Sequence, residues 1–116
     1  MADTVVIDFG MGNLRSVAKA LEHVGARVAV SGDPAVIRAA RRVVFPGQGA
    51  MGACVSRLAG HGLEDAVREA VLTKPFLGIC LGLQALLDFS EEDGGVPGLG
   101  LVAGQVRRFA DGEILP

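Results

Sequence analysis

The chain has 116 residues, of which 50% are hydrophobic, and its formal net charge is −2. This length suffices for one domain with a modest core, and the composition indicates neither disorder nor a nucleic-acid-binding face. No apolar run approaches the ~18 residues that cross a bilayer, and the N-terminus lacks the basic start of a signal peptide. With only two cysteines, no disulfide framework is expected. We therefore expect a soluble, cytoplasmic domain that binds neither nucleic acid nor membranes.

Apolar runs and turn residues alternate along the first part of the chain, as strands and helices do in α/β proteins. Strands are predicted at residues 5–9, 27–31 and 42–45. Helices are predicted from Leu14 up to a stop at Gly25, over 34–40, over part of 51–58, and over 63–73.

The second part begins with a fourth strand, residues 76–79, which leads into a helix over 81–89. Residues 90–100 are acidic and rich in Gly and Pro, which indicates a loop, and 98–104 and 105–109 are strand-like. We expect an α/β fold of three layers, a mostly parallel sheet flanked by helices on both faces. The Gly-rich turns after Phe9, Phe45 and Ile79 would share the carboxyl edge of that sheet, where ligands bind.

The most informative motif is G-I-C-L-G-L-Q at residues 78–84. It places Cys80 between two glycines where a strand turns into a helix, which is the context of a nucleophile elbow, with Cys in place of Ser. Cys80 is therefore the candidate nucleophile. The competing interpretation is a small buried side chain, and for Cys54, which has no such frame, packing is the preferred interpretation.

Neighbouring residues can serve such a thiol. The N–H of Leu81 and an N–H from the Pro46–Gly49 turn are candidate donors to an oxyanion. Gln84 lies one helical turn after Cys80 and is a candidate substrate contact or a solvated side chain. The acidic run at 91–93 either holds a substrate ammonium or is a solvated loop. Gly10-x-Gly12 lacks the third glycine of a dinucleotide fingerprint, because position 15 is Arg.

A general base is harder to find. A nucleophilic Cys is normally paired with a His that a carboxylate orients. The chain has only His23, near the end of the first predicted helix, and His61, in a Gly-flanked turn. Neither is a convincing partner for Cys80.

The motif at 78–84 resembles the G-x-C-x-G-x-Q signature of class I (triad-type) glutamine amidotransferases. Residues 7–17, I-D-F-G-M-G-N-L-R-S-V, are similar to the N-terminal motif of one branch, the glutaminase subunits of imidazole glycerol phosphate synthase. Residues 46–51, P-G-Q-G-A-M, resemble that branch's P-G-V-G segment with Gln48 in place of Val. The resemblance runs from Val5 to Pro116.

It implies that glutamine is hydrolysed to glutamate and ammonia through a Cys80 thioester, with no cofactor and no metal. By position, Gln84, Glu92 and Gly49 match contacts to L-glutamine. Gly47 and Leu81 match the oxyanion donors, Gly47 after a peptide reorientation in some members.

The resemblance also implies a partner. The loop made of Gly10, Met11, Gly12 and Asn13 would face the cyclase subunit of imidazole glycerol phosphate synthase, a (β/α)₈ barrel, in a heterodimer. That barrel would use the ammonia to make imidazole glycerol phosphate in histidine biosynthesis.

One departure is large, because the family's His-Pro-Glu segment does not occur in this sequence. We expect residues 1–116 to be the N-terminal part of a single amidotransferase domain, since a parallel sheet cut here has an unpaired edge. A genuine short form is the alternative. Two other functions stay open: an inactive scaffold that docks the cyclase subunit, and a different α/β hydrolase with a Cys elbow.

Overall fold

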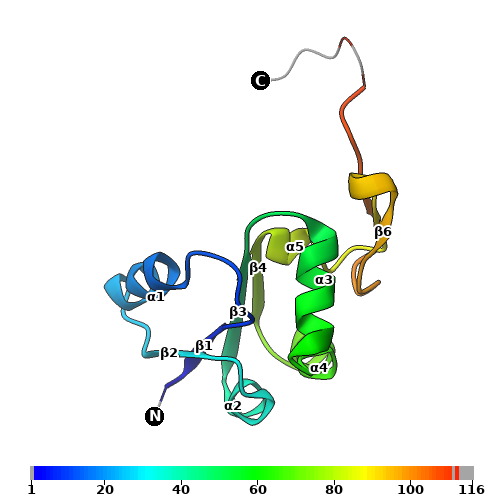
Figure 1. Cartoon of the computed structure of the whole chain (residues 1–116). Coiled ribbons are helices and arrows are strands. Elements are labelled where there is room, and N and C mark those ends of the chain that lie inside the picture. Colours follow the sequence, from blue (N-terminus) through cyan, green and yellow to red (C-terminus); the bar gives the residue numbers. More distant parts are fainter. Residues whose placement is uncertain (1, 111, 113–116) are drawn as a thin grey trace.

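The fold is built on a four-stranded parallel sheet (Figure 1). The computed structural model describes residues 2–110 and 112. Strand order is β2-β1-β3-β4, so the first strand of the chain lies inside the sheet and β4 lies at one edge. The strands are β1 (Thr4–Ile7), β2 (Val28–Ser31), β3 (Arg42–Gly47) and β4 (Phe76–Cys80). All three strand pairs are parallel, as predicted.

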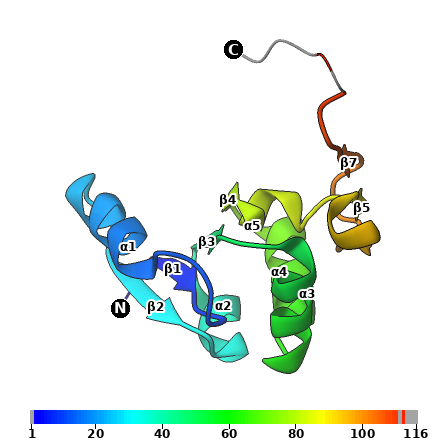
Figure 2. The ribbon, with the colours of Figure 1, turned by 45° about the horizontal axis from the view of Figure 1, so that its top comes forward.

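Helices cover both faces of this sheet, and Figure 2 shows α1 on one side with α3 and α4 on the other. They are α1 (Leu14–His23), α2 (Pro34–Ala39), α3 (Met51–Gly60) and α4 (Glu64–Thr73). The three-layer α/β expectation is confirmed. None of the helices within residues 2–110 is long and apolar enough to cross a membrane.

The main core lies between the sheet and α2, α3 and α4. Alternate strand residues point into it, because successive side chains of a strand face opposite sides. They meet Ile37, Leu58 and Val67 from the three helices, all fully buried. The rings of Phe9 and Phe45 pack with their centroids 5.2 Å apart. This core fixes the carboxyl ends of β1 and β3 side by side.

The opposite face is less completely covered. Helix α1 packs over β1 and β2, while Leu77 on the edge strand β4 is 52% exposed. Two apolar hollows of ≈ 540 and ≈ 380 Å³ lie here, and Leu21 and Leu77 line both.

Local signals explain where α1 and α2 begin. Asn13 caps α1, because its side chain accepts a hydrogen bond from the Ser16 N–H at 3.3 Å. Asp33 caps α2 through the Ala35 N–H at 2.9 Å, and Pro34 occupies the first position, where no N–H is needed.

The third strand is longer than predicted, since it continues through Pro46 and Gly47. Proline normally breaks a central strand because it lacks an N–H. Strand β1, however, pairs with β3 only as far as Val44, so Pro46 has left the β1 ladder and pairs with Ile79 of β4 alone. The extension brings Gly47 level with Cys80.

The region after Cys80 differs most from the prediction. The predicted helix over 81–89 is wrong, because α5 (Leu81–Gln84) is a single turn. The carbonyl oxygen of Ala85 accepts the Leu99 N–H at 2.8 Å, and that of Leu86 accepts the N–H groups of Leu101 and Val102. The N–H groups of residues 99–102 therefore occupy the carbonyl oxygens that the next turn of the helix would have needed as acceptors.

A small second sheet occupies the region predicted as a loop and a strand. It has the order β6-β5-β7 and consists of β5 (Phe89–Ser90), β6 (Val96–Pro97) and β7 (Gln105–Val106), with the 3₁₀ turn η1 (Glu92–Gly94) between β5 and β6. The strand predicted over 98–104 is wrong, and of 105–109 only β7 is extended in a sheet. The end of the family resemblance, 113–116, lies outside the described residues.

Candidate active site

Cys80 is the last residue of β4 and immediately precedes α5. Its backbone has φ 54° and ψ −116°, and it is one of two described non-glycine residues with positive φ. Such a conformation costs of order 1–3 kcal/mol and persists only where surrounding packing enforces it. The side chain is exposed. The predicted elbow is therefore present as a strained strand-to-helix turn that presents a free thiol.

The two glycines that frame Cys80 are required by close packing. A methyl group at Gly78 would lie 2.9 Å from the carbonyl oxygen of Gly82 and from the backbone of Leu83. One at Gly82 would collide with the carbonyl oxygen of Phe45 on β3. These contacts let α5 fold back onto β3 and β4, which holds the thiol at the carboxyl edge of the sheet.

Gly47 lies directly beside Cys80, because the two are register partners in the β3–β4 ladder. A methyl group at Gly47 would be 3.1 Å from the Cβ of Leu81 and 3.2 Å from the N of Gly82. The two residues predicted to supply oxyanion donors, Gly47 and Leu81, are thus brought next to the thiol and to each other. Gly49, with φ +100°, continues the turn away from the sheet.

Glu92 reaches the same edge from the small sheet. Its Oε2 accepts a hydrogen bond from the N–H of Met51, the first residue of α3, at 3.0 Å. No side chain of Ala50, the N-cap, serves that helix end, so the Glu92 carboxylate satisfies an N–H there and is favoured by the helix dipole. The link joins residues 41 positions apart, and no local sequence signal predicts it.

Gln84 is the last residue of α5 and is half-buried, one turn beyond Cys80. The loop of Gly10, Met11, Gly12 and Asn13 lies on the other side of the site, against the backbone of Pro46 and Gly47. The predicted site residues from four separate segments therefore gather around one edge of the sheet.

The neighbouring acidic residue Glu91 is held by two arginines. Its carboxylate accepts the Arg108 N–H at 2.9 Å and the Nε of Arg107 at 3.4 Å. The hydrogen bond from the Arg108 backbone, followed by the bond and charge of Arg107, lowers the pKa of Glu91 below its ordinary value. Glu91 thus secures β7 to the small sheet, while Glu92 turns toward α3.

The family model described as glutamine amidotransferase class-I matches residues 5–106, a range that contains every one of these site residues. The chain belongs to the class-I glutamine amidotransferase family.

Individual relatives in this family are similar along nearly the whole chain. The chain is 59% identical over 117 aligned positions to the imidazole glycerol phosphate synthase subunit HisH of Aromatoleum aromaticum, covering 99% of this chain and 55% of that protein. It is 60% identical over 111 positions to the protein of the same name from Nitrosospira multiformis, covering 94% and 52%. The chain spans about half the length of the curated relatives it matches.

A solved structure described as a crystal structure of glutamine amidotransferase has the same fold. The TM-score is 0.75 at 23% sequence identity, and the match covers 94% of this chain and 58% of that one. The amidotransferase fold expected from the sequence is therefore confirmed.

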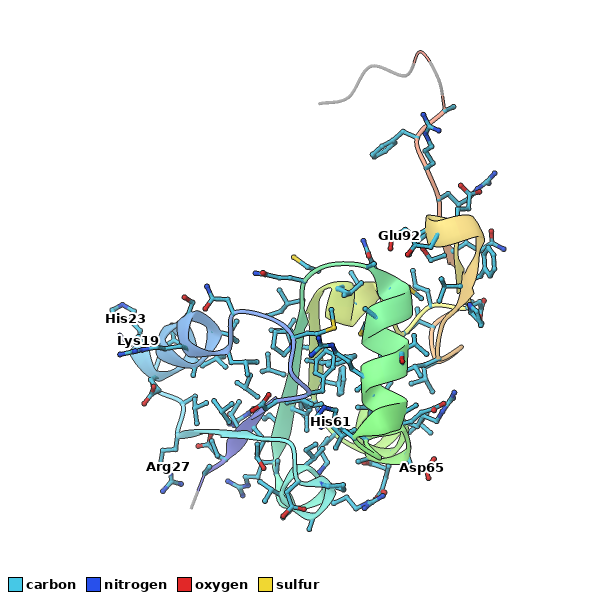
Figure 3. All side chains as sticks on the ribbon, viewed as in Figure 1. Lys19, His23, Arg27, His61, Asp65 and Glu92 are labelled. Carbon is cyan, nitrogen blue, oxygen red and sulfur yellow. The ribbon has the colours of Figure 1, made fainter. Side chains whose placement is uncertain are left out.

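Neither histidine of this amidotransferase chain lies at the elbow. His61 follows α3, whose ten residues separate it from Met51 by about 15 Å at 1.5 Å per residue. His23 ends α1, and Figure 3 shows both histidines well away from Glu92. Within the described residues, no imidazole therefore lies beside Cys80.

Cys54 is fully buried in the core, as its preferred interpretation required. Burial raises the pKa of this thiol to about 11. Loss of solvation disfavours the thiolate, which is the reactive form. Cys80 is therefore the accessible cysteine of this amidotransferase chain, and Cys54 is a packing residue.

Proposed function

We propose that this chain carries the nucleophile half of a glutaminase site, in which Cys80 attacks the side-chain amide of L-glutamine. One observation carries the proposal: an exposed thiol on a strained elbow, in register with Gly47 and followed directly by Leu81, in a chain of the class-I family. That arrangement provides an accessible sulfur beside two backbone segments able to face a developing oxyanion.

The chemistry runs in two steps. The Cys80 thiolate forms a bond to the amide carbon, and the carbonyl electrons move to an oxyanion that the N–H groups of Leu81 and Gly47 stabilise. Collapse of this intermediate breaks the C–N bond, and the nitrogen takes up a proton and leaves as ammonia. Water then adds to the thioester and releases glutamate and the free thiol.

The two proton transfers call for a general base, and His23 and His61 both lie away from the elbow. We propose that this base comes from polypeptide other than residues 2–110. The relatives that match are about twice as long as this chain, which gives such a segment a source.

Gln84, Glu92 and Gly49 are proposed to orient glutamine over Cys80. One oxygen of the Glu92 carboxylate accepts the Met51 N–H, and the other can receive a substrate ammonium. Gly49 is exposed and lies two residues before Met51, whose N–H holds Glu92, and Gln84 can donate to a substrate carbonyl.

The partner proposed for the loop of Gly10, Met11, Gly12 and Asn13 is the cyclase subunit of imidazole glycerol phosphate synthase, which would receive the ammonia. The name of the relatives, a subunit of that synthase, supports this partner. Two of these residues, Met11 and Gly12, contact the Pro46–Gly49 turn, so a bound partner would lie close to the oxyanion side of the site.

The test is glutamate release by a protein of the relatives' length that contains this sequence together with the segment supplying the base, with a saturating cyclase subunit and an acceptor analogue, against the same protein carrying Cys80→Ala. Turnover well above the variant supports the proposal. Tight binding of the cyclase subunit without any turnover would instead support the scaffold function. Turnover of a simple ester with no effect of glutamine would favour a different Cys-elbow hydrolase, which the family match argues against.

A further inference from the structure

Arg57 of α3 is bonded to the loop beside the elbow. Its Nη1 donates to the carbonyl oxygen of Gly10 at 2.9 Å, across 47 positions of sequence. Gly10 has φ +85°, and a methyl group there would lie 2.6 Å from the same Nη1. Glycine at this position therefore permits both the left-handed backbone and the close approach of the guanidinium.

The loop held by Arg57 rests on the turn that precedes α3. A methyl group at Gly12 would be 3.5 Å from the carbonyl oxygen of Pro46 and from the N of Gly47. One at Gly49 would be 3.4 Å from the Cε of Met11. The loop and the turn are thus in contact at two points, at Gly12 and at Met11.

The same helix is secured at its beginning, where the Met51 N–H is bonded to Glu92. The Pro46–Gly49 segment begins in β3 and leads to the start of α3, and its exposed residues Gln48 and Gly49 lie beside the loop that Arg57 retains. If the loop loosens, the segment loses its contacts with Gly12 and Met11 next to Gly47, the register partner of Cys80.

We propose that Arg57 is a positioning residue that fastens the Gly10–Asn13 loop to α3 and thereby sets the backbone of the Pro46–Gly49 turn beside Cys80. The part that concerns glutamine rests on the function proposed above. The claim that Arg57 couples the loop to the turn does not depend on that function.

The first measurement is hydrogen exchange of the backbone amides in the wild type and in Arg57→Met, which keeps an apolar stem and removes the donors. Loss of one charge-assisted hydrogen bond should raise exchange about ten-fold at residues 10–13 and also at 47–49. Arg57→Lys should restore part of the protection. Arg68→Met on α4 is the matched control, since Arg68 is paired with Glu64 away from the site.

The second measurement is the rate of Cys80 alkylation by a chloromethyl ketone built on the glutamine backbone, compared with iodoacetamide. Arg57→Met should slow the glutamine-shaped reagent about ten-fold through weaker reversible binding, and leave the iodoacetamide rate within two-fold. A substitution that only destabilised the fold would instead raise the rate of Cys80 alkylation by both reagents or leave both rates unchanged.

Unchanged exchange at 47–49 would overturn the proposal, whether or not the loop itself loosens. If the wild type shows no preference for the glutamine-shaped reagent, the proposed function fails and the exchange result alone decides the role of Arg57. If circular dichroism shows that Arg57→Met is unfolded, Arg57→Gln replaces it with the same expected pattern.

Discussion

Gly82 packs against the main-chain carbonyl of Phe45. Replacing it by alanine, which adds only a methyl group, therefore tests the packing of the elbow. Gly82→Ala should lower the free energy of unfolding by about 3 kcal/mol, because a methyl group at this position overlaps backbone and not a flexible side chain. Chemical denaturation gives the value. The exposed Cys80 thiol should also be alkylated faster, because α5 no longer packs closely against β3.

Gly60, at the end of α3, is the matched control for this substitution. Nothing lies within 4 Å of a methyl group there, so Gly60→Ala should stabilise the chain by about 0.5–1 kcal/mol through helix propensity. Equal effects of the two alanines would contradict the packing described for the elbow.

For single residues, the sequence predicts the conformation of a short motif well and contacts between distant residues poorly. The spacing of Gly78, Cys80 and Gly82 was enough to predict the elbow, because turn geometry is encoded within a few residues. The bonds from Glu92 to Met51 and from Arg57 to Gly10 were not predicted, since each joins residues more than 40 positions apart. Whether Gln84 and Gly49 contact substrate stays a prediction.

Among the elements, α2 depends on Lys74, the extended residue directly after α4. The Nζ of Lys74 donates to the carbonyl oxygens of Ile37, Arg38 and Ala40 at 3.1, 2.8 and 2.7 Å. These are acceptors at and beyond the end of α2, and a cation there also meets the negative end of the helix dipole.

Lys74→Met should lower the free energy of unfolding by about 1–3 kcal/mol, because three carbonyls lose a charged donor while the apolar stem is kept. Thermal and urea unfolding measure this. Lys19→Met on the exposed side of α1 (Figure 3) should change the stability by less than about 0.5 kcal/mol. A Lys74 effect no larger than that of Lys19 would refute the capping role.

The attachment of β7 should depend on pH through Glu91. Its pKa is lowered from the ordinary value of 4.5, so the folded state binds the proton more weakly than the unfolded chain does. The Glu91 contribution is therefore complete above the unfolded-state pKa and is lost as pH falls through the lower folded-state pKa. Melting temperatures of the wild type and of Glu91→Gln should differ most above about pH 5 and converge in acid. A difference that grows on acidification would contradict the ion pair.

The short α5 shows why element boundaries fail in sequence prediction. Residues 81–89 carry apolar side chains at helical spacing, and Leu81, Ala85 and Leu86 are indeed buried. Their carbonyls, however, are satisfied by residues 99–102 and not by the next helical turn. Competition from distant chain cannot be read from periodicity.

In the molecule as a whole, the exposed apolar surface of note is formed by the edge strand β4 and the apolar hollows beside it. Leu77 is 52% exposed on a strand that has no charged residue, and uncharged edges are sites of association. We expect the chain to self-associate at micromolar concentration, which sedimentation velocity measures.

Leu77→Lys should suppress this association and change the stability by less than about 1 kcal/mol, because a charge on an edge strand resists pairing. Leu72 on α4 is the matched control, as it is 76% exposed but lies away from the sheet edge. Equal suppression by Leu72→Lys would mean that β4 is not the surface involved.

The layer order and the parallel sheet were predictable because apolar strands alternate with amphipathic helices throughout residues 4–80. The small sheet after Ser90 was not, since strands of two residues leave almost no periodic pattern. The placement of His61 relative to Cys80 could not be read from the sequence, and it is the structure of residues 2–110 that puts it at the far end of α3.

The central claim is that Cys80 is a glutamine-directed nucleophile. The most direct test is alkylation by the chloromethyl ketone that carries the glutamine backbone, with the modified residue located by peptide mass spectrometry. The account predicts one adduct, on Cys80, formed with loss of chloride and slowed by free L-glutamine, while buried Cys54 stays unmodified. An adduct on Cys54, or labelling of Cys80 that L-glutamine does not slow, would contradict it.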